Sequence, residues 1–261
     1  MLLPRIIPCL LVKNGRLVKT VNFTQPKYVG DPINTVKIFN EKEVDELIVL
    51  DIGASVLGNE PDYPLIKKMA TECRMPLCYG GGVKTIEQVE RIIGLGVEKV
   101  AISSAAVHDP DLITRAADVV GTQSVVVVMD VRNSILDGKY ILWTHNGRVQ
   151  TQLSAVESAT HFQEMGAGEI VVNSIDRDGS MMGYDFALAS AVKEVISCPI
   201  TILGGAGSLR DIEALIHSFG NIGAAAGSLF VFKGKYRAVL ISYPSRAQKE
   251  ALVIQKQQVG P

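Results

Sequence analysis

The stretch CYGGGVKTIEQVERIIGLGVEKVAISSAAV, residues Cys78 to Val107, organises this chain, because it returns in altered form as ILGGAGSLRDIEALIHSFGNIGAAAGSLF, residues Ile202 to Phe230. Each copy contains an apolar run, two or three glycines, a Thr or Ser, a helical stretch, an apolar strand and a loop of small residues. Pro76 precedes the first copy as Pro199 precedes the second. A repeat of nearly half the chain length indicates two related halves.

Along the whole chain, apolar runs of strand length alternate with amphipathic helical stretches, which predicts βα units and a parallel sheet. The strands are expected at residues 5–12, 47–51, 77–79, 99–103, 124–130, 169–173, 200–203 and 222–226. Eight units in about 250 residues are typical of a closed (β/α)8 TIM barrel, of the α/β class, whereas a doubly wound sheet usually has fewer strands and a spaced glycine fingerprint. We therefore predict one barrel over residues 1–243, built from half-barrels at about 1–120 and 121–243, and a frayed or weakly helical tail over 244–261.

Side chains that can accept a hydrogen bond predict where several helices begin. These N-cap candidates are Asp31, Thr85, Asp109, Ser154 and Ser208. Two segments, residues 13–30 and 132–151, exceed ordinary loop length, and both follow strand ends on the face where barrels hold their sites. Within the second segment, Asp137-Gly138 predicts a tight hairpin turn.

The composition is that of a soluble globular protein, with 47% hydrophobic residues, 20% charged residues and a formal net charge of −1. This balance offers no basic face for nucleic acid. No apolar run reaches ~18 residues, so no membrane span is expected, and Pro4 and Pro8 interrupt the apolar N-terminus, which favours a buried strand over a leader peptide. The cysteines lack neighbouring histidines at metal-ligand spacing, so we expect buried thiols in a reduced cytoplasm and no metal site.

Carboxylates at the ends of the expected strands are the first candidates for chemistry. Asp51 and Asp176 lie at equivalent places in the two halves, and each could either work in a site or cap the loop that follows. When the first strand is aligned on the fifth, Leu11 lies opposite Asp130. A carboxylate at both positions would make an acid–base pair, and here one partner is missing.

The glycine-rich loops predict two anion sites, because backbone N–H groups at such barrel loops bind phosphate. One site would comprise Gly204, Gly205, Ala226, Gly227 and Ser228. Its twin would comprise Gly81, Gly82, Ser103 and Ser104, so the substrate would carry a phosphate at each end. Lys19, in the first long segment, could pair with a phosphate or be a solvated surface lysine. No role is expected for the four histidines.

Four charged residues fall at the amino ends of the strands, and they could form either a solvated rim or a closed ring. They are Arg5, Glu46, Lys99 and Glu169.

Nine short sequence motifs follow one another along the chain: RIIPCL, GDP, LDI, GGGV, AVHDPDLI, THNGR, GAGEI, DRDG and GGAGS. By these motifs the chain resembles the cyclase subunit of imidazole glycerol phosphate synthase over nearly its whole length. The resemblance implies a lyase-type cyclase of histidine biosynthesis that works without a cofactor. It also implies a heterodimer, in which a glutaminase subunit docks on the N-terminal face of the barrel and supplies ammonia. The acceptor would be a ribulosyl-formimino-aminoimidazole nucleotide, converted to imidazole glycerol phosphate and an aminoimidazole carboxamide ribotide.

The resemblance also implies roles for particular residues. Asp130 would be catalytic, and the four charges would form an ammonia gate. Substrate or phosphate would be bound by Lys19, Gly81, Gly82, Ser103, Ser104, Asp176, Gly204, Gly205, Ala226, Gly227 and Ser228.

Leu11 departs from the family, which has a second catalytic carboxylate at this position, and the loss of one acid–base partner typically lowers the rate about 10²- to 10⁴-fold. The stretch from Thr24 to Tyr28 departs too. In this the chain is similar to second-copy paralogues found with surface-polysaccharide genes. Three functions stay open: a cyclase, an ammonia-channelling subunit that makes an amino or amidino sugar for lipopolysaccharide, and a scaffold that activates the glutaminase.

Overall fold

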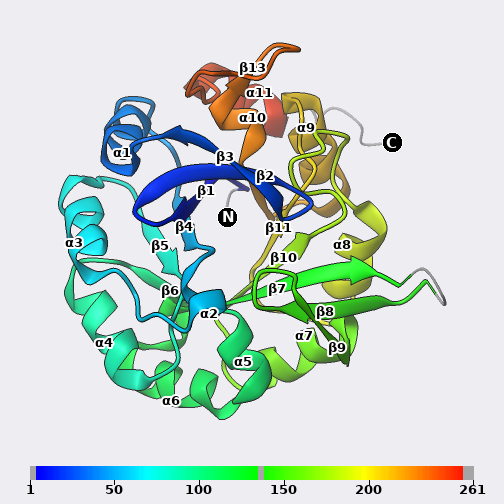
Figure 1. The fold of residues 1–261 in the computed structure, drawn as a ribbon. Helices are drawn as coiled ribbons and strands as arrows, with labels where there is room; N and C mark the ends of the chain where they lie inside the picture. Colours follow the sequence, from blue (N-terminus) through cyan, green and yellow to red (C-terminus); the bar gives the residue numbers. More distant parts are fainter. Residues whose placement is uncertain (1–3, 135–137, 255–261) are drawn as a thin grey trace.

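The protein is described by a computed structural model that covers residues 4–134 and 138–254. Eight parallel strands form a closed barrel, because β1 pairs with β12 and β7 pairs with β10 as well as with their other neighbours (Figure 1). The strands are β1 (Arg5–Lys13), β4 (Leu47–Asp51), β5 (Leu77–Gly80), β6 (Lys99–Ile102), β7 (Val125–Asn133), β10 (Glu169–Ser174), β11 (Ile200–Leu203) and β12 (Gly223–Ala226). The predicted (β/α)8 TIM barrel is confirmed.

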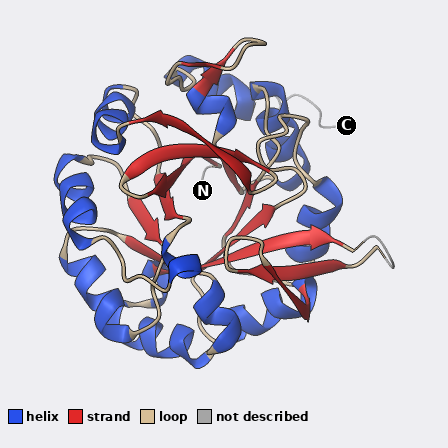
Figure 2. Cartoon of the chain, in the orientation of Figure 1, coloured by secondary structure: helices blue, strands red, loops and turns tan. Residues whose placement is uncertain are grey.

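Helices surround the barrel and cover its outer face (Figure 2). The longer ones are α1 (Pro32–Glu41), α3 (Tyr63–Glu72), α4 (Ile86–Gly94), α6 (Asp111–Val120), α7 (Ala155–Glu164), α8 (Phe186–Lys193) and α9 (Leu209–Phe219). Shorter ones follow strand ends or precede a strand: α2 (Ala54–Leu57), α5 (Ser104–His108), α10 (Ser228–Val231) and a 3-10 turn at Thr122–Ser124. A buried apolar cluster between strands and helices accounts for the unbroken apolar runs in the sequence.

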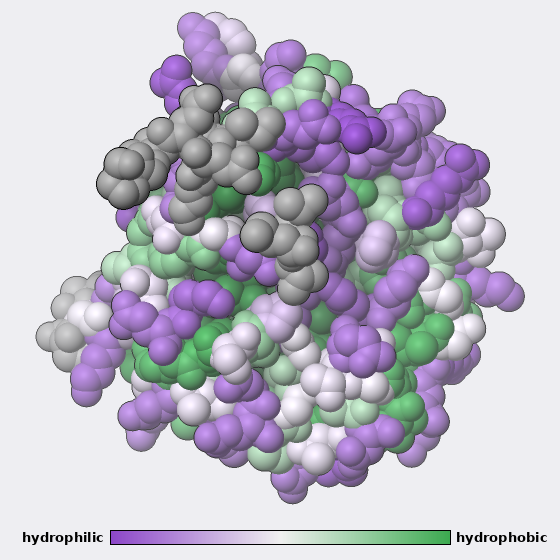
Figure 3. Space-filling view, turned by 180° about the vertical axis from the view of Figure 1, so that it is seen from behind, coloured by the Kyte–Doolittle hydropathy of each residue, from purple (hydrophilic) through white to green (hydrophobic). Residues whose placement is uncertain are grey.

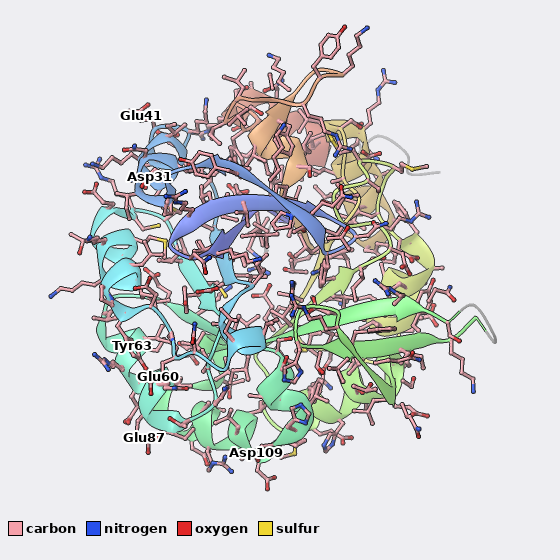
Figure 4. The ribbon with its side chains drawn as sticks, viewed as in Figure 1. Asp31, Glu41, Glu60, Tyr63, Glu87 and Asp109 are labelled. Carbon is pink, nitrogen blue, oxygen red and sulfur yellow. The ribbon has the colours of Figure 1, made fainter. Side chains whose placement is uncertain are left out.

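Capping explains where most of the outer helices begin. Asp31 accepts from the backbone N–H of Asn34 at 2.8 Å, and Thr85 forms a capping box with Gln88. Ser154 and Ser208 also stand at the N-cap of their helices. The prediction that Asp109 is an N-cap is wrong. The N-cap of α6 is Pro110, and the Asp109 carboxylate pairs with Arg115 at 2.6 Å instead. Figure 4 places Asp31 and Asp109 at the periphery of the molecule.

The first long segment forms strands rather than the long loop that the sequence suggested, and the second forms paired strands on both sides of the predicted hairpin turn. β2 (Arg16–Val21) and β3 (Thr24–Gly30) form a hairpin that continues antiparallel from β1 across the barrel mouth (Figure 1). β8 (Tyr140–Thr144) and β9 (Val149–Ser154) extend β7 in the same way. The predicted turn at Asp137-Gly138 falls partly outside the described residues.

The tail is also more ordered than predicted, within its described part. A short pair, β13 (Phe232–Lys233) and β14 (Ala238–Val239), precedes helix α11 (Arg246–Ile254). Leu252 is buried, and the Lys249 Nζ atom lies 2.6 Å from the Asp45 carboxylate. The tail is held because it reaches the amino ends of the barrel strands, where the Tyr243 hydroxyl donates to the carbonyl oxygen of Ile6.

A second apolar cluster fills the inside of the barrel. Its members are Ile7, Cys9, Leu11, Ile48, Cys78, Ala101, Val126, Val128, Val171, Leu203 and Ala225. Cys9 and Cys78 are buried as expected, whereas Cys73 and Cys198 are half-buried; all four are free thiols. Among the described residues, no helix is long and apolar enough to cross a bilayer.

Candidate functional site

A cavity of about 300 Å³ opens at the carboxyl ends of the strands, within the range of small-molecule sites. Several predicted residues line it: Lys19, Gly81, Gly82, Ser103, Ser104, Asp130 and Gly227. Other predicted residues are not among its lining residues: Asp176, Gly204, Gly205, Ala226 and Ser228. The half of the barrel that carries Gly81 therefore contributes more of the wall.

Asp130 lies on β7 in the cavity wall, and its Oδ1 atom accepts from the side-chain amide of Asn173 at 2.9 Å. Burial raises the pKa of Asp130 to about 7, because removal of water disfavours the charged carboxylate more than the Asn173 hydrogen bond favours it. A carboxyl group with a pKa near neutrality can either donate or accept a proton, as general acid–base chemistry requires.

Leu11 lies in the wall of the same cavity and is 8% exposed. Its neighbours in the sheet are Val18 on β2 and Leu50 on β4, so this side of the cavity is apolar. The apolar wall is part of the reason that Asp130 is desolvated.

The two glycine turns share one geometry. Gly81 has a φ of +127°, and a Cβ atom there would lie 2.6 Å from the carbonyl oxygen of Asp51. Gly204 has a φ of +99°, and a Cβ atom there would lie 2.6 Å from the carbonyl oxygen of Ser174. Each turn thus packs against the end of the neighbouring strand, β4 for Gly81 and β10 for Gly204. This close contact requires glycine whether or not a ligand binds.

Ser228 offers a polar group that the protein leaves unused. Its hydroxyl oxygen is buried and has no hydrogen-bond partner within the described residues. Ser228 follows Gly227, which lines the cavity, and it begins α10. A buried, unbonded hydroxyl at this position is suited to a ligand oxygen.

Asp178 is a site residue that the sequence analysis missed. It is buried, its carboxylate lies 2.6 Å from Lys19 Nζ, and it accepts from the Thr20 hydroxyl at 2.7 Å. Lys19 is therefore a buried, paired residue on β2 rather than a mobile loop lysine. Asp176, two residues earlier, is exposed and lies near Arg132 at 3.2 Å. The sequence DRDG contains both aspartates, and only the turn after β10 decides which one points inward.

Asp51 lines the cavity, but its Oδ1 atom accepts from the backbone N–H groups of Gly53 and Ala54 at 2.8 and 3.2 Å. Burial raises the pKa of Asp51, and these two hydrogen bonds oppose the shift. Of the two interpretations left open for Asp51, capping of the following loop describes its contacts.

Two histidines that the sequence analysis left without a role also line the cavity. The rings of His108 and His145 meet edge to face, with centroids 5.7 Å apart. The backbone N–H of His145 donates to the Ser104 hydroxyl at 3.0 Å, which fixes the β8–β9 turn against α5. No pattern in the sequence brings them together, because α5 and this turn are distant along the chain.

At the opposite end of the barrel, the four predicted charges form a closed ring rather than a solvated rim. Lys99 lies 2.7 Å from Glu46 and 2.8 Å from Glu169, while Arg5 bonds both carboxylates and lies 2.7 Å from Glu169. Burial acts to raise the pKa of Glu169, but the hydrogen bonds and positive charges of Arg5 and Lys99 outweigh it and lower the pKa to about 2. The surrounding N-terminal face mixes hydrophilic and hydrophobic residues (Figure 3).

Comparison with known proteins agrees with this geometry. Residues 5–237 match the family described as "Histidine biosynthesis protein". The chain is 53% identical over 252 residues to "Putative imidazole glycerol phosphate synthase subunit HisF" of Leptospira interrogans, covering 97% of this chain and 99% of the relative. It is 55% identical to "Putative imidazole glycerol phosphate synthase subunit hisF3" of Vibrio vulnificus, over 96% of both chains. It is 42% identical to "Imidazole glycerol phosphate synthase subunit HisF" of Alkaliphilus metalliredigens, over 88% of this chain and 91% of the relative.

Proposed function

The chain belongs to the histidine biosynthesis protein family, among relatives named as HisF subunits of imidazole glycerol phosphate synthase, and from this premise we propose that it is the ammonia-accepting subunit of a cytoplasmic glutamine amidotransferase. In this proposal a separate glutaminase subunit docks on the N-terminal face. Ammonia then crosses the charged ring and the barrel interior and reacts at the C-terminal cavity with a phosphorylated small molecule.

The observation that carries the proposal is the apolar interior between the charged ring and Asp130. Beyond the ring, the inner cluster consists of aliphatic side chains and two cysteines. Burial raises the pKa of the Cys9 and Cys78 thiols, so both stay neutral. A neutral, apolar interior favours uncharged ammonia over ammonium, because a charge pays a large desolvation cost there.

The cavity supports an acceptor with anionic ends. The Gly81-Gly82 and Gly204-Gly205 turns precede the N-termini of α4 and α9, where backbone N–H groups favour phosphate. Lys19 lies in the cavity wall with its charge paired to Asp178, and Asp130 supplies a proton donor or acceptor. Asp176 is exposed near Arg132, so a role in substrate binding would require the acceptor to extend over the rim.

Leu11 favours an acceptor other than the ribulosyl nucleotide of histidine biosynthesis. Ring closure in the family uses two carboxylates, and leucine can neither donate nor accept a proton. Besides the cyclase of histidine biosynthesis, the second candidate is therefore delivery of ammonia to form an amino or amidino group on a sugar for surface polysaccharide. The third is activation of the glutaminase without chemistry of its own.

The test is turnover of the ribulosyl-formimino-aminoimidazole nucleotide by the purified barrel with excess ammonium salt. We expect little imidazole glycerol phosphate from the unmodified protein and a gain of about 10²-fold or more in Leu11→Asp, because the acid–base pair is restored. Leu11→Asn is the control, since asparagine is polar and of the same size as aspartate but has no group that titrates near neutral pH.

Full turnover by the unmodified protein would establish the cyclase and reject the alternatives. The two alternatives are separated by Asp130→Asn in the complex with the glutaminase. Under ammonia delivery this variant loses product while glutaminase activation survives. Under the scaffold function the barrel forms no product of its own, and the variant changes nothing.

A further inference from the structure

Asp130 and Asn173 form a pair across two neighbouring strands. They are register partners in the parallel ladder of β7 and β10, so their side chains leave the sheet on the same side. The Asn173 Nδ2 atom donates to Asp130 Oδ1 at 2.9 Å. Both residues line the cavity, and Asn173 is 4% exposed.

Apolar residues flank this pair along the strands of the barrel. Leu203 on β11 is the register partner of Asn173 on its other side. Across the cavity, Leu11, Leu50 and Gly80 follow one another from β1 to β5. The titratable groups nearest Asp130 are Cys9 on β1, Lys19 on β2 and Asp178 after β10. Lys19 and Asp178 are paired at 2.6 Å, yet the negative charge of Asp178 still helps to raise the pKa of Asp130. Further around the cavity lie Asp51, His108, Asp109 and His145. Asn173 is therefore the polar group that bonds the Asp130 carboxyl within the described part of the chain.

The side-chain oxygen of Asn173 is not used in the bond to Asp130. Its Oδ1 is buried and has no hydrogen-bond partner among the described residues. It lies beside the Gly204 turn, where a Cβ atom would be 3.4 Å away. A buried acceptor without a partner is costly and is usually explained by a water or a ligand.

We propose that Asn173 is a positioning residue for Asp130, and that with Asp130 it binds a small N–H donor such as ammonia or ammonium. Its Nδ2 atom fixes Asp130 Oδ1 and leaves Oδ2 for the ligand, while its Oδ1 atom accepts a second N–H. A side-chain amide does not act as a general acid or base near neutral pH, so Asp130 is the one member of the pair that can donate or accept a proton. This inference rests on the proposed function and deepens it by naming the two side chains that bind the N–H donor.

The test follows the titration of Asp130 in the isolated barrel by ¹³C NMR of carboxyl-labelled aspartate, with the signal assigned by its loss in Asp130→Asn. Because Asn173 stabilises the charged carboxylate, Asn173→Leu raises the midpoint by about one pH unit. Asn173→Ser keeps a donor and gives a smaller rise. Ser55→Ala removes a polar group from the same cavity wall without contact to Asp130, and it leaves the midpoint in place.

The ligand is probed with ammonium chloride against tetramethylammonium chloride at equal ionic strength. Ammonium lowers the Asp130 midpoint in the unmodified protein because its N–H groups bond the charged carboxylate, and this shift shrinks in Asn173→Leu. Tetramethylammonium, which has no N–H group, does not lower it. Equal effects of the two salts, or an unchanged midpoint in a folded Asn173→Leu variant, would overturn the proposal. Neither readout depends on the glutaminase or the acceptor, so its failure is distinct from failure of the proposed function.

Discussion

At the scale of the residue, Asp130 combines reactivity with a cost in stability. Its carboxyl lies in an apolar wall and bonds one amide, so the folded protein holds its proton up to a pH near 7. An unfolded chain releases the same proton near pH 4. Glu169 shows the opposite case, since two cations lower its pKa to about 2 and favour its charge. The same chemical group, a carboxyl, is therefore held near its protonation midpoint at neutral pH at one end of the barrel and kept charged in an ion ring at the other.

Asp130 predicts how stability depends on pH. Between about pH 4 and pH 7 the folded state binds a proton that the unfolded state has lost, so the free energy of unfolding falls as pH rises through this window and levels off above it. The loss amounts to at most about 4 kcal/mol. The measurement is chemical denaturation at several pH values, with Asp130→Asn as the reference. If the difference between the two proteins stays constant from pH 4 to pH 8, Asp130 is ionised in the folded state.

At the scale of the element, the strand-to-helix turns follow one pattern in both halves of the barrel. Gly81 and Gly204 each reverse the chain directly beneath the end of the neighbouring strand, with positive φ values and a carbonyl oxygen where a Cβ atom would stand. The repeat in the sequence is thus a repeat of backbone geometry. The turn before α4 lines the cavity, whereas the turn before α9 does not.

This geometry predicts opposite effects for two glycine substitutions. Gly204→Ala destabilises the protein by about 2 kcal/mol or more, because the methyl group meets the Ser174 carbonyl oxygen and the backbone is left-handed. Gly94→Ala, in the last turn of α4 with no atom within 4 Å of the added Cβ, is neutral or stabilises by up to about 1 kcal/mol. Thermal unfolding of both variants decides the matter, and similar losses at the two positions would contradict it.

At the scale of the whole molecule, the barrel mouth is closed by a contact between its two halves. The β2–β3 hairpin comes from the first half, and Lys19 and Thr20 on it bond Asp178 after β10 in the second half. The backbone N–H of Asn22 adds a bond to the carbonyl oxygen of Asp178 at 2.9 Å. These contacts hold the hairpin over the cavity that contains Asp130.

Asp178→Asn should release this hairpin, because Lys19 loses its partner while buried, and removal of one member of a buried pair typically costs about 3–5 kcal/mol. We expect faster limited proteolysis between residues 21 and 26, detected by mass spectrometry of the fragments. Asp176→Asn is the matched control: the same change two residues away, at an exposed carboxylate, leaves the cleavage rate within about twofold of the unmodified protein. Equal cleavage of both variants would mean that the hairpin is held by other contacts.

The barrel, its eight strands and most helix starts are predictable from the sequence, because strand-length apolar runs, capping residues and glycine turns are local signals that agree along the chain. The internal repeat also shows that Leu11 and Asp130 occupy equivalent positions in the two halves of the sequence. Tertiary contacts decide which aspartate of DRDG turns inward, that Asn173 bonds Asp130, that two histidines meet at the rim, and that the first long segment pairs as strands. These contacts join residues far apart in the chain, and they depend on strand register and turn geometry, to which the local pattern of apolar and polar residues is insensitive.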